Sequence, residues 1–157
     1  MVHEILYLLK ETLGDHTAEA SKTGVRGLIA AKTALNPCDV MDKFKAILHE
    51  RPYEFRYALR IIPIDRVVDT DLEAIGLAAA DLAMGISEKE SFRVTVEKRF
   101  TTLHANEIVE AVASRIQRRV DLENPDKVLL VEVVGKFTGV SLARPASVLS
   151  VPKEKML

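Results

Sequence analysis

The chain has 157 residues, a net charge of −1 and 48% hydrophobic residues, which excludes a disordered protein and fits one compact domain or two small ones. Its single cysteine excludes an internal disulfide, and aromatic residues are only 5% of the chain. Residues 1–88 carry 10 Lys and Arg against 14 Asp and Glu, whereas residues 89–157 carry 12 against 9. We therefore expect the second half to attract a polyanion.

The first half of the chain is expected to alternate helices and strands. Gly14 is a typical end for an apolar N-terminal helix, and Pro37 suits the first turn of another helix. Farther on, Arg56 and Arg60 alternate with apolar residues, which places them on one face of a strand. The expected elements are a helix over 1–14, a polar loop over 15–24, a strand over 25–35, a helix over 38–50 and a strand over 54–64.

The second half continues the alternation. Asp69 or Thr70 is expected to cap one helix. Thr102, His104 or Asn106 is expected to cap the next, with the Thr102 and Asn106 side chains the better chemical candidates. The expected elements are a connector over 65–70, a helix over 71–84, a strand over 92–100, a helix over 104–120, a strand over 128–134, a tight turn over 135–139, a third strand and a tail over 146–157 with a short edge strand. This order predicts an α+β fold with α/β layers, in which helices pack on sheet faces.

The sequence carries no recognisable catalytic motif. It has no phosphate-binding loop, no dinucleotide fingerprint and no nucleophile elbow. The four histidines are scattered and form no metal-binding pair. Asp65, Asp69 and Asp71 are close in sequence, but a helix start explains them better than acid–base catalysis. We expect no catalytic residue, no metal and no cofactor. No segment resembles a signal peptide or a membrane span, so we expect a cytoplasmic protein.

Basic residues on the predicted strands and turns are the candidates for a binding site. Each of them alone is also consistent with a solvated surface charge. Together they are expected to line a groove for phosphates, because Lys and Arg neutralise phosphate charge without reading sequence. The predicted RNA-binding residues are Arg56, Arg60, Arg93, Lys98, Arg99, Lys136 and Arg144.

An ordered set of short motifs between residues 54 and 145 resembles a THUMP domain. Each motif alone is weak, whereas their order, with a helix between Lys98-Arg99 and the next motif, is fairly specific. The motifs are Arg60-Ile61-Ile62-Pro63, Phe92-Arg93-Val94, Lys98-Arg99, Val120-Asp121-Leu122, Asn124-Pro125-Asp126 and Gly139-Val140-Ser141.

The resemblance implies both an architecture and a function. It implies a small ferredoxin-like α/β subdomain over 1–64, a THUMP-like RNA-binding domain over 65–145 and a C-terminal tail over 146–157. It also implies binding near the acceptor end of tRNA, without a cofactor. Because the chain ends soon after the THUMP-like part, it is similar to the stand-alone adaptors that assist tRNA cytidine acetylation. A separate modifying enzyme is then the expected protein partner.

Two alternatives stay open at this point. The first alternative to the adaptor is an RNA-modifying enzyme with an unrecognised site. The second is a scaffold that binds only proteins. A salt series separates the scaffold from an RNA-binding protein, because binding to phosphates weakens steeply with salt.

Overall fold

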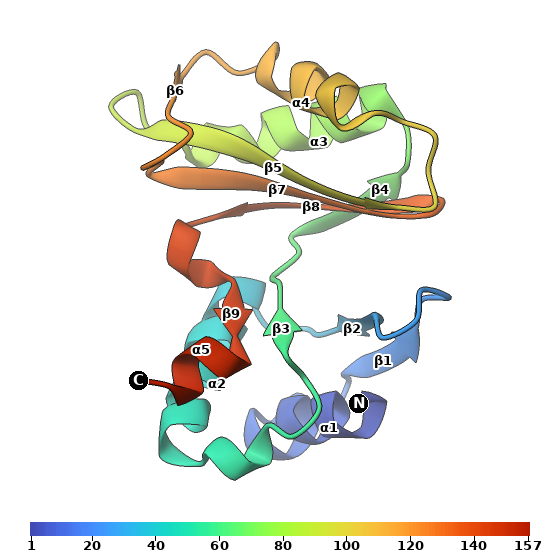
Figure 1. The fold of residues 1–157 in the computed structure, drawn as a ribbon, viewed down its shortest axis with the longest axis vertical. Coiled ribbons are helices and arrows are strands. Elements are labelled where there is room, and N and C mark those ends of the chain that lie inside the picture. Colours follow the sequence, from blue (N-terminus) through green and yellow to red (C-terminus); the bar gives the residue numbers. More distant parts are fainter. The chain divides into compact units, whose positions relative to one another are not determined.

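The computed structural model describes all 157 residues, which form two compact units (Figure 1). Unit 1 consists of Met1–Pro63 together with Ser147–Leu157, and unit 2 is the continuous segment Ile64–Ala146. Each unit has its own cluster of buried hydrophobic side chains. Helices and strands are mixed throughout the chain, which confirms the predicted α+β class.

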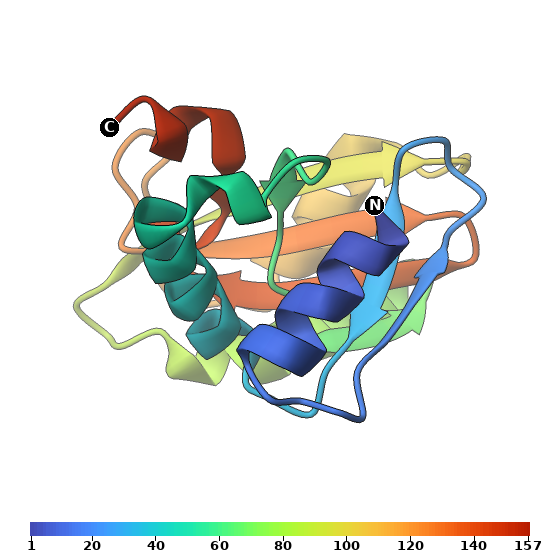
Figure 2. The same ribbon diagram turned by 90° about the horizontal axis from the view of Figure 1, so that it is seen from below.

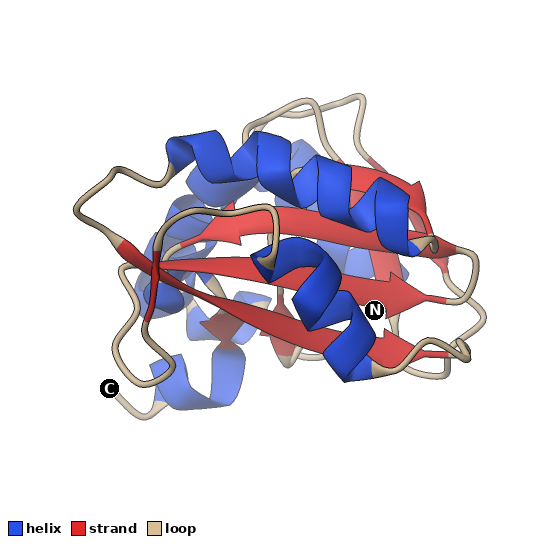
Figure 3. Ribbon diagram, turned by 90° about the horizontal axis from the view of Figure 1, so that it is seen from above, coloured by secondary structure: helices blue, strands red, loops and turns tan.

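Unit 2 is a five-stranded sheet with two helices on one face, as Figure 3 shows. The strand order is β4-β8-β7-β5-β6, in which β5 runs parallel to β6 and β7, and β8 runs antiparallel to β4 and β7. The elements are β4 (Arg66–Asp69), α3 (Leu72–Leu82), a 3-10 turn (Ala83–Gly85), β5 (Ser91–Arg99), α4 (Ala105–Ala113), β6 (Arg119–Val120), β7 (Lys127–Val134) and β8 (Phe137–Ala143).

The alternating pattern of β5 explains how the sheet is covered. Phe92 is buried, and Val94 packs with it against the core under the helices. Ile108 and Val112 of α4 are fully buried in the same core. Because side chains alternate along a strand, Arg93 and its i+2 neighbours lie on the opposite face of the sheet.

Unit 1 combines helices with two separate two-stranded antiparallel sheets, β1–β2 and β3–β9. Figure 2 looks onto its helices α1 and α2. Phe44 and Phe55 meet edge to face in its core, with ring centroids 5.9 Å apart. The elements are α1 (Val2–Tyr7), a π-helical turn (Leu8–Thr12), β1 (Glu19–Lys22), β2 (Ile29–Lys32), α2 (Pro37–Glu50), a 3-10 turn (Pro52–Glu54), β3 (Arg60–Ile61), β9 (Leu149–Ser150) and α5 (Val151–Lys155).

Several expectations for unit 1 need correction. The predicted loop over 15–24 contains β1, because its residues pair with β2 in a hairpin, and the strand predicted over 25–35 shrinks to β2. The strand predicted over 54–64 is wrong except for β3. Phe55 and Ala58 are buried at the start of this stretch, three residues apart, whereas a strand would bury every second residue. The strand–helix–strand that we expected to contribute to a ferredoxin-like unit therefore has its two strands in different sheets.

In unit 2 two predicted elements change, the cap of α3 differs from both candidates, and the cap of α4 is His104, one of its three candidates. The connector over 65–70 is wrong, because it contains β4 at the sheet edge. The helix predicted over 104–120 ends at Ala113, because the N–H groups of Arg115 and Ile116 bond three residues back instead of four, and β6 follows. Asp71 caps α3, and His104 precedes α4 with its N–H donated to Glu107 (3.0 Å). The turn after β7 is limited to two residues, 135 and 136.

The last segment is not a solvated tail. Leu149 and Val151 are buried in the unit 1 core, and β9 pairs with β3. The carboxylate of Glu154 lies 2.8 Å from His49 Nε2 and 3.7 Å from Lys45 Nζ. Lys155 Nζ donates to the carbonyl of Phe55 (2.8 Å). The expectation of a tail over 146–157 is therefore wrong, since the segment completes unit 1.

Asp15 fixes the loops around the β1–β2 hairpin. Its carboxylate accepts hydrogen bonds from the Thr17 hydroxyl (2.6 Å), the Thr33 hydroxyl (2.5 Å) and the Ala34 N–H (2.8 Å). These bonds, with that of the Thr17 hydroxyl the strongest, hold the pKa of the Asp15 carboxyl well below its usual range. The ionised carboxylate therefore stabilises the folded state.

This arrangement predicts a pH-dependent stability difference between the wild type and Asp15→Asn. Because the folded pKa is depressed, the contribution of Asp15 is present above its unfolded pKa of about 3.9 and is lost as the pH falls through the folded pKa. Urea unfolding at pH 7 should show the wild type more stable than Asp15→Asn, and the gap should shrink at pH 3. An equal gap at both values would mean that the charge of Asp15 does not contribute.

Candidate nucleic-acid interface

One end of the unit 2 sheet forms an open, shallow depression of about 500 Å³. It lies where the parallel strands β5 and β7 both end, and where the chain leaves β4. We call its lining the rim, and include the adjacent Phe137. The rim consists of Thr70, Phe100, Thr101, Thr102, Gly135, Lys136 and Phe137. Backbone hydrogen bonds join its three segments, from Thr70 N–H to the Lys136 carbonyl and from Gly135 N–H to the Arg99 carbonyl (both 2.9 Å).

Two phenylalanine rings project from the rim into solvent. Phe100 is 76% exposed and Phe137 is 60% exposed, although large aromatic side chains are usually at least partly buried. Phe100 is also the one residue other than glycine with a positive φ, at 57°. A left-handed backbone is unfavourable for a side chain of this size. Such strain is found preferentially at functional sites, so the backbone of Phe100 makes the rim a candidate binding site.

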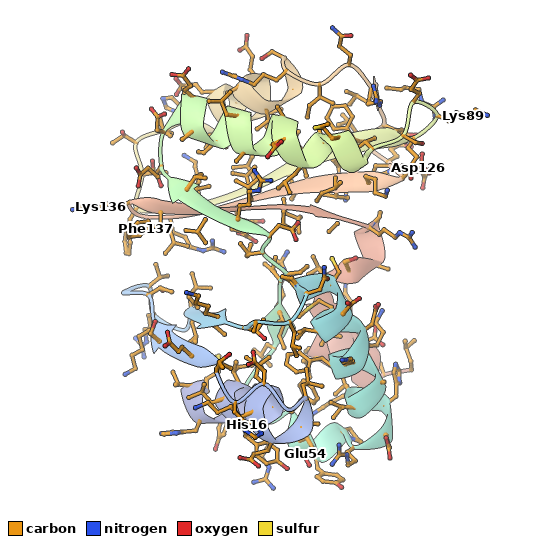
Figure 4. All side chains as sticks on the ribbon, turned by 180° about the vertical axis from the view of Figure 1, so that it is seen from behind. His16, Glu54, Lys89, Asp126, Lys136 and Phe137 are labelled. Atoms are coloured by element: carbon orange, nitrogen blue, oxygen red, sulfur yellow. The ribbon has the colours of Figure 1, made fainter.

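The basic side chains of the rim region differ in their availability. The Lys136 side chain is exposed in the turn between β7 and β8 and makes no ion pair within the chain. Figure 4 shows Lys136 and Phe137 at one end of unit 2, with Lys89 and Asp126 at the other. Lys98 Nζ donates to the carbonyl of Leu103 (3.2 Å), which holds the loop after β5. Lys136 is therefore the cation best placed to meet a phosphate.

Arg99 is half-buried and is engaged in an ion pair. Its guanidinium lies 3.1 Å from a carboxylate oxygen of Glu132 on the neighbouring strand β7. Glu132 itself is buried, so the pair satisfies a charge that would otherwise be costly to bury. Arg99 therefore contributes to the order of the sheet, and its charge is partly neutralised at the rim.

The structure brings together only three of the seven predicted binding residues: Lys98, Arg99 and Lys136. Arg93 donates to the carbonyl of Leu122 (2.9 Å) near the start of β5, and Arg144 follows the last residue of β8. Both therefore lie toward the opposite end of the sheet, because β8 runs antiparallel to β7.

Arg56 and Arg60 belong to unit 1, and the strand face that they were predicted to share does not exist. Arg56 lies in a loop, whereas Arg60 begins the two-residue strand β3. The two arginines therefore do not share a strand face with one another.

The folded units also redistribute the charge. Unit 2 carries 11 Lys and Arg against 14 Asp and Glu, whereas unit 1 carries 11 against 9. The positive balance expected for the second half of the chain therefore does not hold for unit 2 as folded. Attraction of a polyanion depends on where individual cations lie, and both units supply exposed ones.

Several motif residues prove to be structural. The N–H and hydroxyl of Ser91 donate to a carboxylate oxygen of Asp126 (2.8 and 3.2 Å), which fixes the start of β5 against the segment before β7. The first of these bonds is the main reason that the pKa of Asp126 is lowered. Asp121 accepts hydrogen bonds from the N–H groups of Glu123 and Asn124 and so closes the loop after β6.

The prediction from sequence missed the aromatic residues of the rim. The available signal was the position of each ring beside a cation, in Arg99-Phe100 and in Lys136-Phe137. The first pair lies at the end of the strand predicted over 92–100 and the second in the turn predicted over 135–139, where side chains are more often exposed than in the middle of the sheet.

Comparison with known families identifies the domain in unit 2. The family model described as THUMP domain matches residues 69–143. This range runs from the end of β4 to the end of β8 and includes every residue of the rim. Residues 69–143 therefore confirm the resemblance to a THUMP domain, whereas the finer resemblance to the adaptors of tRNA cytidine acetylation stays a prediction.

Relatives and solved structures agree with this assignment at the level of fold. The uncharacterized protein MJ0421 of Methanocaldococcus jannaschii is 28% identical over 152 residues, which cover 94% of this chain and 39% of that protein. The crystal structure of PH1313 from Pyrococcus horikoshii Ot3 matches with a TM-score of 0.64 at 22% identity, over 92% of this chain and 48% of the other. TrmN from Thermus thermophilus matches with a TM-score of 0.59 at 17% identity, over 90% and 41%.

A third solved structure is a 4-thiouridine synthetase in complex with RNA and bound ATP. It matches with a TM-score of 0.52 at 15% identity and covers 90% of this chain and 36% of that chain. This chain thus spans less than half the length of each of these proteins. None of its own helices has the length and apolar character needed to cross a bilayer.

Proposed function

We propose that this chain binds RNA, and specifically tRNA, through the rim of its THUMP domain. The observation that carries the proposal is the match of residues 69–143 to the THUMP domain, with an exposed cation and two exposed rings gathered at one end of its sheet. The likeness to a synthetase solved as an RNA complex supports the same class of ligand.

The chemistry of the rim fits recognition of RNA by backbone and by unpaired bases. Lys136 offers a positive charge to a phosphate, and the hydroxyls of Thr101 and Thr102 offer hydrogen bonds to phosphate or ribose. Phe100 and Phe137 offer rings on which bases that have left a helix can stack. The acceptor region of tRNA, which combines a short helix with an unpaired end, is the part that we propose to bind here.

We further propose that the chain presents tRNA to a separate modifying enzyme and supplies no catalytic group. The role that we propose is that of an adaptor for a tRNA cytidine acetyltransferase. The composition of the rim, which is Thr, Phe, Gly and Lys, supports a binding surface, because it contains no pair of carboxylates or histidines for acid–base catalysis.

A matched pair of lysine variants tests whether the rim binds RNA. Lys136→Ala should weaken binding of the full chain to tRNA and reduce the slope of log K against log salt by about 1, because one phosphate contact is lost. Lys89→Ala is the control, since Lys89 is also exposed but lies at the opposite end of unit 2. Equal slopes for both variants and the wild type would remove Lys136 from the interface.

An activity assay tests the adaptor role. The chain alone, incubated with tRNA and either acetyl-CoA or S-adenosylmethionine, should leave the nucleosides unchanged in mass spectrometry of digested tRNA. A new modified nucleoside that this chain produces without a partner would overturn the adaptor role, while binding of tRNA would stand.

A further inference from the structure

All three tyrosines of the chain lie in unit 1, and all three are exposed. Tyr53 and Tyr57 are 64% and 63% exposed, and Tyr7 is 43% exposed. Neither the THUMP domain match nor the rim includes them. We call Tyr7, Tyr53, Tyr57 and the intervening Arg56 the tyrosine surface.

Hydrogen bonds between α1 and the segment after α2 place these residues on one side of the unit. The Tyr7 hydroxyl donates to Glu54 (3.3 Å), the residue next to Tyr53 (Figure 4 labels Glu54). One turn earlier on α1, the carboxylate of Glu4 accepts hydrogen bonds from the N–H groups of residues 56, 57 and 58, at 2.6 to 3.1 Å. Two consecutive turns of α1 thus hold the segment that carries Tyr53 and Tyr57.

The segment is anchored at several points, although it forms only the short 3-10 turn Pro52–Glu54. Phe55 and Ala58 are buried in the core and fix it from below. The carbonyl of Phe55 accepts a hydrogen bond from Lys155 (2.8 Å), and the carbonyl of Leu59 accepts one from Val151 N–H (2.9 Å). Exposed rings on a segment that is already ordered lose little conformational freedom when they bind a ligand.

The charges of the surface favour an anionic ligand. The guanidinium groups of Arg56 and Arg60 are exposed and make no ion pair within the chain. The two nearby carboxylates already have partners within unit 1. Glu4 accepts hydrogen bonds from three backbone N–H groups. Glu54 accepts one from the Tyr7 hydroxyl and lies 3.5 Å from Arg51 Nη1. Unpaired cations beside exposed rings match the phosphates and bases of a nucleic acid.

We propose that the tyrosine surface is a second RNA-binding site, on which unpaired nucleotides stack. This inference rests on the proposed function and adds to it a ligand class for unit 1. The rings of Tyr53 and Tyr57 stack with bases, and Arg56 neutralises the phosphate between them. Only unpaired bases have free faces, so a duplex presents nothing for these rings to stack on.

A protein partner is the competing occupant of such a surface, since Tyr and Arg are also frequent at protein interfaces. A protein interface of that kind is centred on a contiguous apolar patch. Here the exposed aliphatic component is small, with Leu59 the main member, and cations separate the rings. The observations therefore favour RNA, and a protein partner becomes an outcome of the test.

Intrinsic fluorescence offers a direct signal, because the chain has no tryptophan and all its tyrosines belong to this surface. The full chain is titrated with two RNA hairpins of the same stem, one blunt and one with a single-stranded extension of about four nucleotides, near the site size of small single-strand-binding modules. Stacking should quench the tyrosine emission with the extended hairpin and leave it nearly unchanged with the blunt one.

Affinities for labelled hairpins then separate stacking from other roles. Tyr53→Ser/Tyr57→Ser should weaken binding of the extended hairpin by at least roughly 5- to 150-fold, the effect of losing a single stacked base, and leave the blunt hairpin unaffected. Tyr53→Phe/Tyr57→Phe is the matched control, because it keeps both rings and should bind like the wild type. Circular dichroism verifies that all variants are folded, as expected for side chains that are mostly exposed.

The outcomes distinguish this inference from the proposed function. If the wild type binds both hairpins equally, or the serine variant binds the extended one normally, the tyrosine surface is not an RNA site, while RNA binding by the chain stands. If the serine variant keeps its RNA affinity but loses binding to the purified modifying enzyme, the surface belongs to a protein partner and the inference is wrong. If the wild type binds neither hairpin nor tRNA, the proposed function falls and this inference with it.

Discussion

Deletion of residues 147–157 is expected to unfold unit 1 while unit 2 stays folded. The deletion removes β9, the partner of β3, and takes two buried side chains, Leu149 and Val151, out of the core. Loss of a buried leucine alone costs about 2–5 kcal/mol, and a domain of this size is stabilised by about 5–15 kcal/mol in total. Loss of α5 also removes Glu154 from His49 and Lys45. Amide exchange of the truncated chain should be fast in α2 and slow in β7.

The control for this deletion removes only Met156 and Leu157. Both side chains are almost fully exposed, so their loss should leave the stability of unit 1 within about 0.5 kcal/mol of the wild type. Slow exchange in α2 after the longer deletion would show that the C-terminal segment does not complete the unit 1 core.

Phe100→Gly is expected to change stability and RNA binding in opposite directions. A left-handed backbone costs a residue with a side chain about 1–2 kcal/mol, whereas glycine adopts it freely at an entropic cost of about 0.5–1 kcal/mol. The ring is mostly exposed, so its removal sacrifices little burial. The free energy of unfolding of the variant should therefore be higher by about 0.5–1 kcal/mol. Its binding to tRNA should weaken by about 1–3 kcal/mol through the lost stacking.

Phe100→Ala separates the two effects. It removes the ring but keeps a Cβ at the positive φ, so the loss of RNA affinity should match that of Phe100→Gly without the gain in stability. Urea unfolding and tRNA titration of both variants provide the comparison. Unchanged affinity in both would show that the strained ring does not take part in binding RNA.

The elements that the sequence predicted well are those whose periodicity is decided locally. The strand β5 and the helix α2 have clear patterns of two and of three to four, and Pro37 at the start of α2 follows an Asn36 side chain that accepts two N–H groups. The strand predicted over 54–64 failed because its alternation was coincidental. The Glu4 carboxylate, more than fifty residues away, binds the N–H groups that a strand would use.

The same contrast between local and long-range features explains which parts of the candidate site the sequence could predict. Lys98, Arg99 and Lys136 were predicted as basic residues near strand ends, and the parallel pairing of β5 with β7 brings those ends together. The partner of Arg99, a buried glutamate on the next strand, depends on register that the sequence does not reveal. The exposure of Phe100 depends on a backbone conformation that is rare for phenylalanine.

Amide hydrogen exchange of the full chain with and without tRNA tests the central claim most directly. We expect bound tRNA to slow exchange at the ends of β5 and β7, in residues 98–104 and 135–138, because the rim is covered. Lys136→Ala should reduce this protection at equal tRNA concentration, and Lys89→Ala should not. Saturating tRNA that leaves exchange in both segments unchanged would contradict RNA binding at the rim.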